Sequence, residues 1–185
     1  MEQPKYGLAL FIFLAIPPVA HLMESIMIIH MHMQMPLIVI AGILMAPFFQ
    51  KRYPNFFAEW NEDGIPGILL FLIVFGFWMI PKTMDDALTI VPVELFKFFS
   101  LAILCGIPLR DSWKKLSDKK KNMVFILFII LFSLMGSLYM FSPNQLCNNY
   151  LQIEQVTLAW GFFITAAALL IYVLQLLLIN PDDYE

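Results

Sequence analysis

Histidine and methionine side chains concentrate between residues 21 and 36, where they could coordinate a soft metal ion. All three histidines of the chain lie in this segment, together with five of its twelve methionines and one carboxylate, Glu24. Imidazole and thioether groups together suit copper, and soft thioether ligands select Cu(I). Because ionisable groups are costly in hydrocarbon surroundings, their presence in such an apolar segment indicates a function.

The spacing of these residues divides them if the segment is helical. His21, Glu24 and His32 fall on one stripe, whereas His30 points to the opposite side. A rise of roughly 16 Å separates His21 from His32, so the two cannot bind one ion without a break in the helix. The segment therefore predicts two separate copper sites.

The first predicted site lies near the outer membrane face, and the second lies nearer the middle of the membrane. Ligands for the first come from His30, His32, Met33 and Met35. The second pairs His21 with Glu24. A structural interpretation stays open for both sites. Methionine also fills irregular gaps in apolar cores, and a histidine and a carboxylate can instead hydrogen-bond across helices.

A second pair of charges lies in another apolar segment. Glu94 and Lys97 are three residues apart, so on a helix they face each other and neutralise two costly charges. We predict that they form an intramembrane polar pair. Two alternatives stay open: a role in proton relay or assembly, and a contact between Lys97 and Glu24 on a facing helix.

Two further pairs of polar residues are expected on the outer membrane face. They are Asp85, Asp86, Glu154 and Gln155. Each pair stands near the start of a predicted helix, where the macrodipole favours negative charge. Stabilisation of a helix start is therefore at least as good an interpretation as a metal or proton role.

The composition predicts an integral membrane protein with an all-α fold. The 185 residues are 61% hydrophobic and only 14% charged, whereas soluble domains carry about a quarter charged residues. Short polar segments leave no room for a separate soluble domain, so residues 1–185 form a single membrane domain. Nucleic-acid binding is not expected, because membrane topology explains the one basic cluster, Lys114 to Lys121. No hydrolase or nucleotide-binding motif is present, so we expect no enzymatic turnover.

About six transmembrane helices are predicted, since a helix needs roughly 20 apolar residues to cross a bilayer. The predicted spans are 6–29, 36–49, 66–80, 87–109, 123–141 and 153–179. A re-entrant piece within 6–49 stays open. Six of the eleven basic residues follow the fourth span, which places that loop and both termini in the cytoplasm. The membrane is expected to be a prokaryotic cell membrane.

Several short motifs resemble the CtaG-type membrane assembly factors of cytochrome c oxidase. The resemblance rests on Trp78-Met-Ile-Pro-Lys-Thr-Met-Asp-Asp-Ala-Leu88, Glu94-Leu-Phe-Lys97, Gly106-Ile-Pro-Leu-Arg-Asp-Ser-Trp113, the His/Met run before Pro36-Leu-Ile-Val-Ile-Ala-Gly42, and Glu154-Gln155 ahead of Ala159-Trp160-Gly161. These motifs follow the family's order over most of the chain. The resemblance implies a polytopic helical bundle linked to copper delivery for a membrane oxidase.

Three functions follow as hypotheses. The first is copper handling that assists the assembly of, or copper delivery to, a membrane copper enzyme such as a terminal oxidase. The second is a non-catalytic accessory subunit of a membrane copper oxidase or monooxygenase. The third is a small transporter or proton channel that uses His21, Glu24, Glu94 and Lys97. The expected partners are the lipid bilayer and the subunits of a membrane metalloenzyme.

Overall fold

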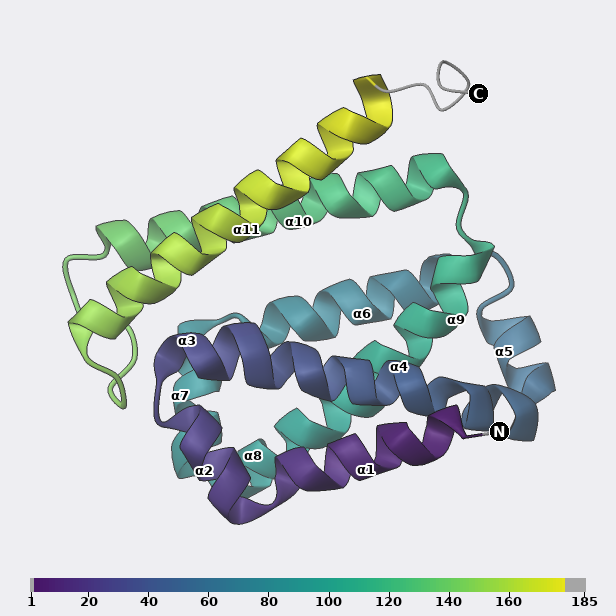
Figure 1. Cartoon of the computed structure of the whole chain (residues 1–185), viewed down its shortest axis with the longest axis horizontal. Coiled ribbons are helices and arrows are strands. Elements are labelled where there is room, and N and C mark those ends of the chain that lie inside the picture. The colour runs from purple at the N-terminus through teal and green to yellow at the C-terminus, as the bar shows by residue number, and fades with distance from the viewer. Residues whose placement is uncertain (1, 179–185) are drawn as a thin grey trace.

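The computed structural model describes residues 2–178, and each regular element in that range is a helix (Figure 1). The elements are α1 (Gln3–Ala15), α2 (Pro17–Glu24), α3 (Met27–Ile29), η1 (His30–Gln34), α4 (Met35–Arg52), α5 (Pro54–Trp60), α6 (Ile65–Trp78), α7 (Pro81–Thr89), α8 (Val91–Phe99), η2 (Ser100–Gly106), α9 (Ile107–Lys115), α10 (Asp118–Phe141) and α11 (Gln152–Leu178). The predicted all-α fold is confirmed.

Four continuous helices are long and apolar enough to cross a membrane. They cover Met27–Arg52, Val91–Lys115, Asp118–Phe141 and Gln152–Leu178. Two bent pairs add up to two more spans: α1 with α2, bent by 70°, and α5 with α6, bent by 87°. The chain is therefore an integral membrane protein with four to six spans, in agreement with the predicted number of about six.

The first two spans differ from their predicted boundaries. The predicted span 6–29 breaks at Ile16, whose backbone is extended (φ −63°, ψ 124°). Ile16 precedes Pro17, and the residue before a proline is disfavoured in helical conformation. The second span begins at Met27 rather than at Pro36. As a consequence, the His/Met run lies inside the second span and not in a connecting loop.

Wide π-helical turns interrupt two of the long helices. The turn η1 is followed closely by Pro36, and the turn η2 is followed closely by Pro108. A proline inside a helix lacks an N–H and its ring collides with the carbonyl four residues earlier. That carbonyl belongs to a residue of η1 in the first case and of η2 in the second, so the wider turns relieve the collision. Such turns often lie at functional sites.

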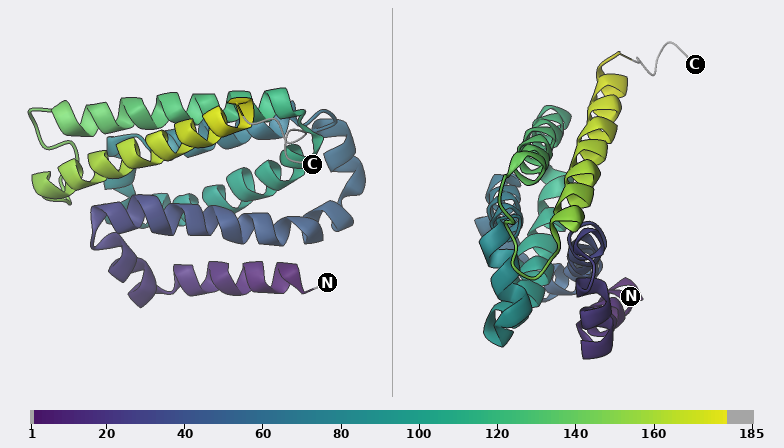
Figure 2. Two further views of the ribbon diagram at one scale, coloured as in Figure 1. Left: turned by 45° about the horizontal axis from the view of Figure 1, so that its top comes forward. Right: turned by 90° about the vertical axis from the view of Figure 1, so that its left-hand side faces the viewer.

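The helices pack as a core group with one pair of helices beside it (Figure 2). Helix α4 contacts α1 on one side and η2 and α9 on the other, whereas α10 and α11 pack mainly against each other. Two glycines allow the close crossing of α4 and η2. A Cβ atom on Gly42 would overlap the carbonyl of Ala102, and one on Gly106 would overlap the carbonyl of Val39. Small residues commonly allow membrane helices to approach in this way.

Basic residues gather at one end of the bundle. The start of α1, the end of α4, the short helix α9 and the start of α10 lie at that end, and they carry every lysine and arginine except Lys82 and Lys97 (Figure 1). By the positive-inside rule this end should face the cytoplasm. The cytoplasmic location of both termini stays a prediction, and residues 179–185 lie outside the described residues.

Candidate functional site

A buried ion pair joins two helices that are far apart in the sequence. The ammonium nitrogen Nζ of Lys97 in α8 lies 2.6 Å from Oε1 of Glu24, the last residue of α2. The Lys97 side chain is completely buried and that of Glu24 is 6% exposed. Lys97 thus pairs with Glu24, the alternative partner considered from the sequence. Glu94, its predicted partner, is half-buried in α8 and forms no salt bridge with it among the described residues.

His30 extends this ion pair into a longer polar network. Its Nε2 lies 3.2 Å from Nζ of Lys97, and its Nδ1 lies 2.8 Å from the hydroxyl of Tyr150. That hydroxyl donates to the backbone carbonyl of Glu24 at 2.7 Å. Burial raises the pKa of Tyr150, which keeps this donor protonated. His30 therefore donates from Nδ1 and accepts at Nε2, so it is assigned as neutral imidazole.

The turn η1 and the neighbouring helix α6 complete the network. Nε2 of Gln34 donates to Oε1 of Glu24 at 3.2 Å, so that one carboxylate oxygen accepts from both Gln34 and Lys97. The indole of Trp78, fully buried, donates to the hydroxyl of Ser100 at 2.8 Å. That hydroxyl donates to the carbonyl of Lys97 and so fixes the backbone from which the ammonium projects. Hydrogen bonds in such a network reinforce one another, although the amide oxygen of Gln34 has no partner among the described residues.

His32 occupies a different environment from His30. Both of its ring nitrogens are buried and have no partner in good hydrogen-bond geometry among the described residues, although the ring lies close to the backbone of Gly161. Its ring packs against Phe162, with centroids 4.8 Å apart, and against Gly161, where a side chain would crowd it. Buried imidazole nitrogens are normally satisfied, so this exception requires an explanation.

The His32 ring borders a cavity of about 180 Å³ that methionines also line. Its walls come from η1, α4, α6, α10 and α11. The lining residues are Met31, His32, Met35, Pro36, Phe75, Met79, Phe132, Phe162 and Thr165. Three thioethers and one unpaired imidazole therefore share an apolar cavity. Soft ligands of these two kinds suit Cu(I).

The predicted ligands of the first copper site are separated by the structure. His32 and Met35 line the cavity described above, but both ring nitrogens of His30 are held by Tyr150 and Lys97. Met33 faces away, with 51% of its surface exposed. Met31 and Met79, and not His30 and Met33, line the cavity together with His32 and Met35.

The structure gives the two residues of the second predicted copper site different surroundings. His21 is exposed, whereas the Glu24 carboxylate is held by Lys97 and Gln34. Among the described residues, no three His, Cys, Asp or Glu side chains gather closely enough to hold a metal ion. Methionine ligands lie outside that group of residue types.

The predicted outer-face acids hold loops and helix starts together. Asp85 accepts hydrogen bonds from the side chains of Asn148 and Asn149, at 2.8 and 2.7 Å, which tie α7 to the α10–α11 loop. Asp86 forms a surface ion pair with Lys82, and this contact raises the pKa of Lys82.

Glu154 and Gln155 link the start of α11 to its neighbours. One carboxylate oxygen of Glu154 accepts from the backbone N–H of Met27, and the other accepts from that of Leu151 at 2.9 Å. Gln155 is buried and accepts from the N–H of Leu146 at 2.7 Å. Unpaired amides at helix starts are commonly satisfied by acidic side chains.

Several residues of the ion-pair network and of the His32 cavity were not predicted from the sequence. Tyr150 lies in an irregular loop without periodicity, so no pattern places it against His30. Met79 stands at the end of α6, and only the tertiary fold places it on the same cavity as His32. Met31 alternates with the histidines in the same way as Met33, so the sequence pattern does not distinguish the two methionines.

Comparison of the chain with protein families, with curated proteins and with solved structures finds no match in any of the three.

Proposed function

We propose that this protein handles copper in the membrane, holding Cu(I) as cargo between His32 and the thioethers of Met31, Met35 and Met79. In this proposal it has no turnover of its own. It assists the assembly of a membrane copper enzyme or delivers copper to it. The proposal rests mainly on the half-buried His32 ring, whose two buried nitrogens lack well-placed partners beside a methionine-lined cavity.

The chemistry of the four side chains supports this choice of metal. Neutral imidazole and thioether groups are uncharged, and Cu(I) carries only one positive charge, so a bound ion adds little charge to an apolar region. Magnesium and calcium prefer carboxylate and carbonyl oxygens. The Glu24 carboxylate, on the same segment as His32, is already engaged by Lys97.

The role in enzyme assembly rests on the motifs that resemble the oxidase assembly factors. The accessory-subunit hypothesis is an alternative form of the same proposal. Helices α10 and α11 leave most of their apolar residues uncovered, and these surfaces suit contact with lipid. In the native membrane, an assembly factor should separate from its target enzyme after copper transfer, whereas an accessory subunit should stay bound to it.

A competition titration with a chromophoric Cu(I) chelator tests the proposal on the purified full-length protein. We expect one bound Cu(I) in the wild type, and weaker binding after His32→Phe, Met35→Leu or Met79→Leu. Met33→Leu is the matched control, because Met33 belongs to the same run but is exposed. Equal affinities in the Met33→Leu and Met79→Leu proteins would contradict the proposed site.

Proton transfer is a second candidate function, favoured by the buried pair of Glu24 and Lys97. Buried ionisable residues inside membrane proteins mark proton and ion pathways, and Glu24 of this pair is the last residue of the bent first span. Proton flux in liposomes that is lost in Glu24→Gln protein, but kept in the surface variant Lys82→Met, would support it. Absence of flux in the wild type would reject it.

A further inference from the structure

A groove at the basic end of the bundle combines positive charge with apolar walls. It has a volume of about 660 Å³ and lies between the start of α1 and the end of α4. Its lining includes Pro4, Lys5, Pro47, Phe48, Lys51 and Arg52. Three cationic side chains thus line the groove together with two prolines and a phenylalanine.

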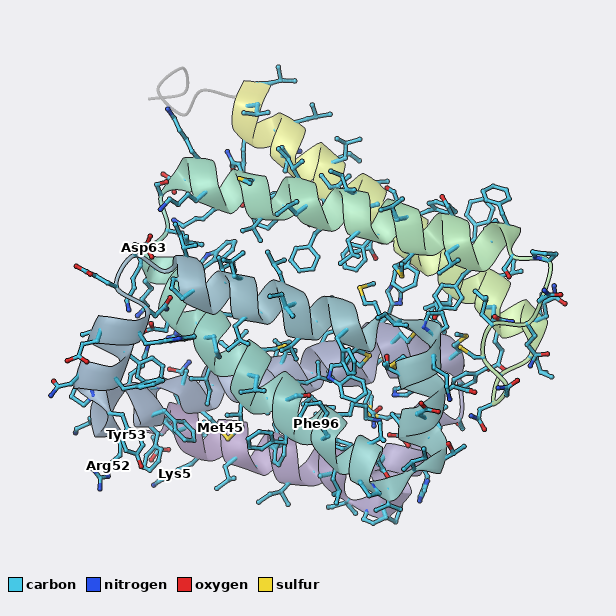
Figure 3. The ribbon with its side chains drawn as sticks, turned by 180° about the vertical axis from the view of Figure 1, so that it is seen from behind. Lys5, Met45, Arg52, Tyr53, Asp63 and Phe96 are labelled. Atoms are coloured by element: carbon cyan, nitrogen blue, oxygen red, sulfur yellow. The ribbon has the colours of Figure 1, made fainter. Side chains whose placement is uncertain are left out.

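A second, smaller groove continues from the first. Its volume is about 260 Å³, and it shares Pro4, Lys5 and Phe48 with the first groove. The remaining walls are Leu8, Met45 and Phe49, all apolar. Figure 3 shows Lys5, Arg52 and Tyr53 at one end of the molecule, with Met45 further toward the middle. The polarity therefore changes from cationic to apolar along the direction from the membrane surface inward.

The cations of the first groove are largely free to bind an anion. Lys51 and Arg52 are exposed, and neither has an ion-pair partner within 4.0 Å among the described residues. Lys5 lies 3.8 Å from Glu2, with both side chains in solvent, so this pair offsets one positive charge only weakly. The Arg52 guanidinium lies over the Tyr53 ring, 5.3 Å from its centroid, which favours one orientation of the side chain.

The start of α1 adds a further favourable element. The start of a helix carries the positive end of the macrodipole. In α1 Pro4 has no N–H, and the N–H groups of Lys5 and Tyr6 already donate to the carbonyl of Glu2, so the macrodipole is what this helix start contributes. Helix α1 begins at Gln3, beside the cations of α4. Because the helices cross a membrane, a molecule with an anionic head and apolar chains is the matching occupant. By the positive-inside rule, this end faces the leaflet that carries anionic lipids.

We propose that the two grooves bind one anionic phospholipid. Its phosphate is held by Lys51 and Arg52 with Lys5 alongside, and one acyl chain lies between Leu8, Met45 and the two phenylalanines of α4. This proposal does not depend on copper binding, since the His32 cavity shares none of these lining residues.

Native mass spectrometry of the purified full chain in neutral detergent tests this proposal. We expect phosphatidylglycerol to bind more tightly than phosphatidylcholine. A Lys51→Gln/Arg52→Gln protein should bind phosphatidylglycerol about 30-fold more weakly, at about 1 kcal/mol for each lost cation. The matched control, Lys114→Gln/Lys119→Gln, removes two exposed lysines from the same end but outside the groove. It should bind like the wild type.

Three outcomes would overturn the proposal. An equal loss in the control protein would mean that only the overall charge attracts lipid. Equal binding of both lipids would exclude recognition of the anionic head. Competition by inorganic phosphate at the affinity of the lipid would mean that a free phosphate, and not a phospholipid, is the ligand. The Phe48→Ala variant provides a further test, because only lipid binding should weaken when this apolar wall is removed.

Discussion

Removal of the Lys97 ammonium alone should destabilise the protein more than removal of both members of its ion pair. In Lys97→Met protein the Glu24 carboxylate stays buried without its cation, 6% exposed. His30 Nε2 also loses its donor. In the double variant Glu24→Gln/Lys97→Met, no unpaired charge remains, and Gln34 can still donate to the amide oxygen at position 24.

The burial of the ion pair determines how much stability each variant should lose. Breaking a buried ion pair by removing one partner costs about 3–5 kcal/mol, whereas replacing both partners by uncharged groups is often close to neutral. We therefore expect each single variant to lose at least about 3 kcal/mol. This loss corresponds to a change of about 150-fold in the unfolding equilibrium. The double variant should lose less than the sum of the two single losses, by a similar amount.

Reversible unfolding in mixed micelles of the wild type, both single variants and the double variant measures this coupling. Lys82→Met is the matched control, because the Lys82 side chain is 77% exposed and its pair with Asp86 lies on the surface. It should show no measurable change. Additive losses in the double variant would refute the reasoning, since they would mean that Lys97 and Glu24 do not interact.

Three further predictions follow from the packing and from the outer loop. Gly42→Ala should destabilise the bundle by about 1–3 kcal/mol in the same unfolding assay, whereas Gly76→Ala, with no heavy atom within 4 Å, should not; equal effects would contradict the close crossing of α4 and η2. Burial raises the pKa of Cys147 to about 11, and the thiolate is the reactive form. In a protein without the other cysteine, its alkylation should therefore be on the order of a hundredfold slower at pH 8 than that of an exposed thiol; a rate that levels off below pH 9 would contradict this. Asp85→Ala should lower hydrogen-exchange protection of the α10–α11 loop, while Asp86→Ala should not, because only Asp85 binds that loop.

The sequence was sufficient for the fold class because apolar runs of spanning length leave few alternatives to helices. The helix ends were harder to predict. The pair Pro17-Pro18 marked an interruption, but the π-helical turn that carries the His/Met run through the second span gives no signal of its own. A proline two residues beyond each π-helical turn is the feature that could have indicated it.

The candidate sites could be predicted only in part, because their residues come from several segments of the chain. Helical periodicity separates His30 from His32 and places them on different sides, as the structure has them. Periodicity within one segment cannot identify residues contributed by other helices. Tyr150 and Met79 reach the two histidines through tertiary packing alone, and the contact of Lys97 with Glu24 stayed one of two alternatives for its partner.

X-ray absorption at the copper edge of Cu(I)-loaded protein is the most direct test of the proposed copper site. A single nitrogen ligand from His32, with sulfur ligands from Met31, Met35 and Met79, is expected. The sulfur contribution should decrease in Met79→Leu protein and stay unchanged in Met33→Leu protein. A copper ion with only nitrogen and oxygen ligands, or an identical spectrum in the Met79→Leu protein, would contradict the proposed site.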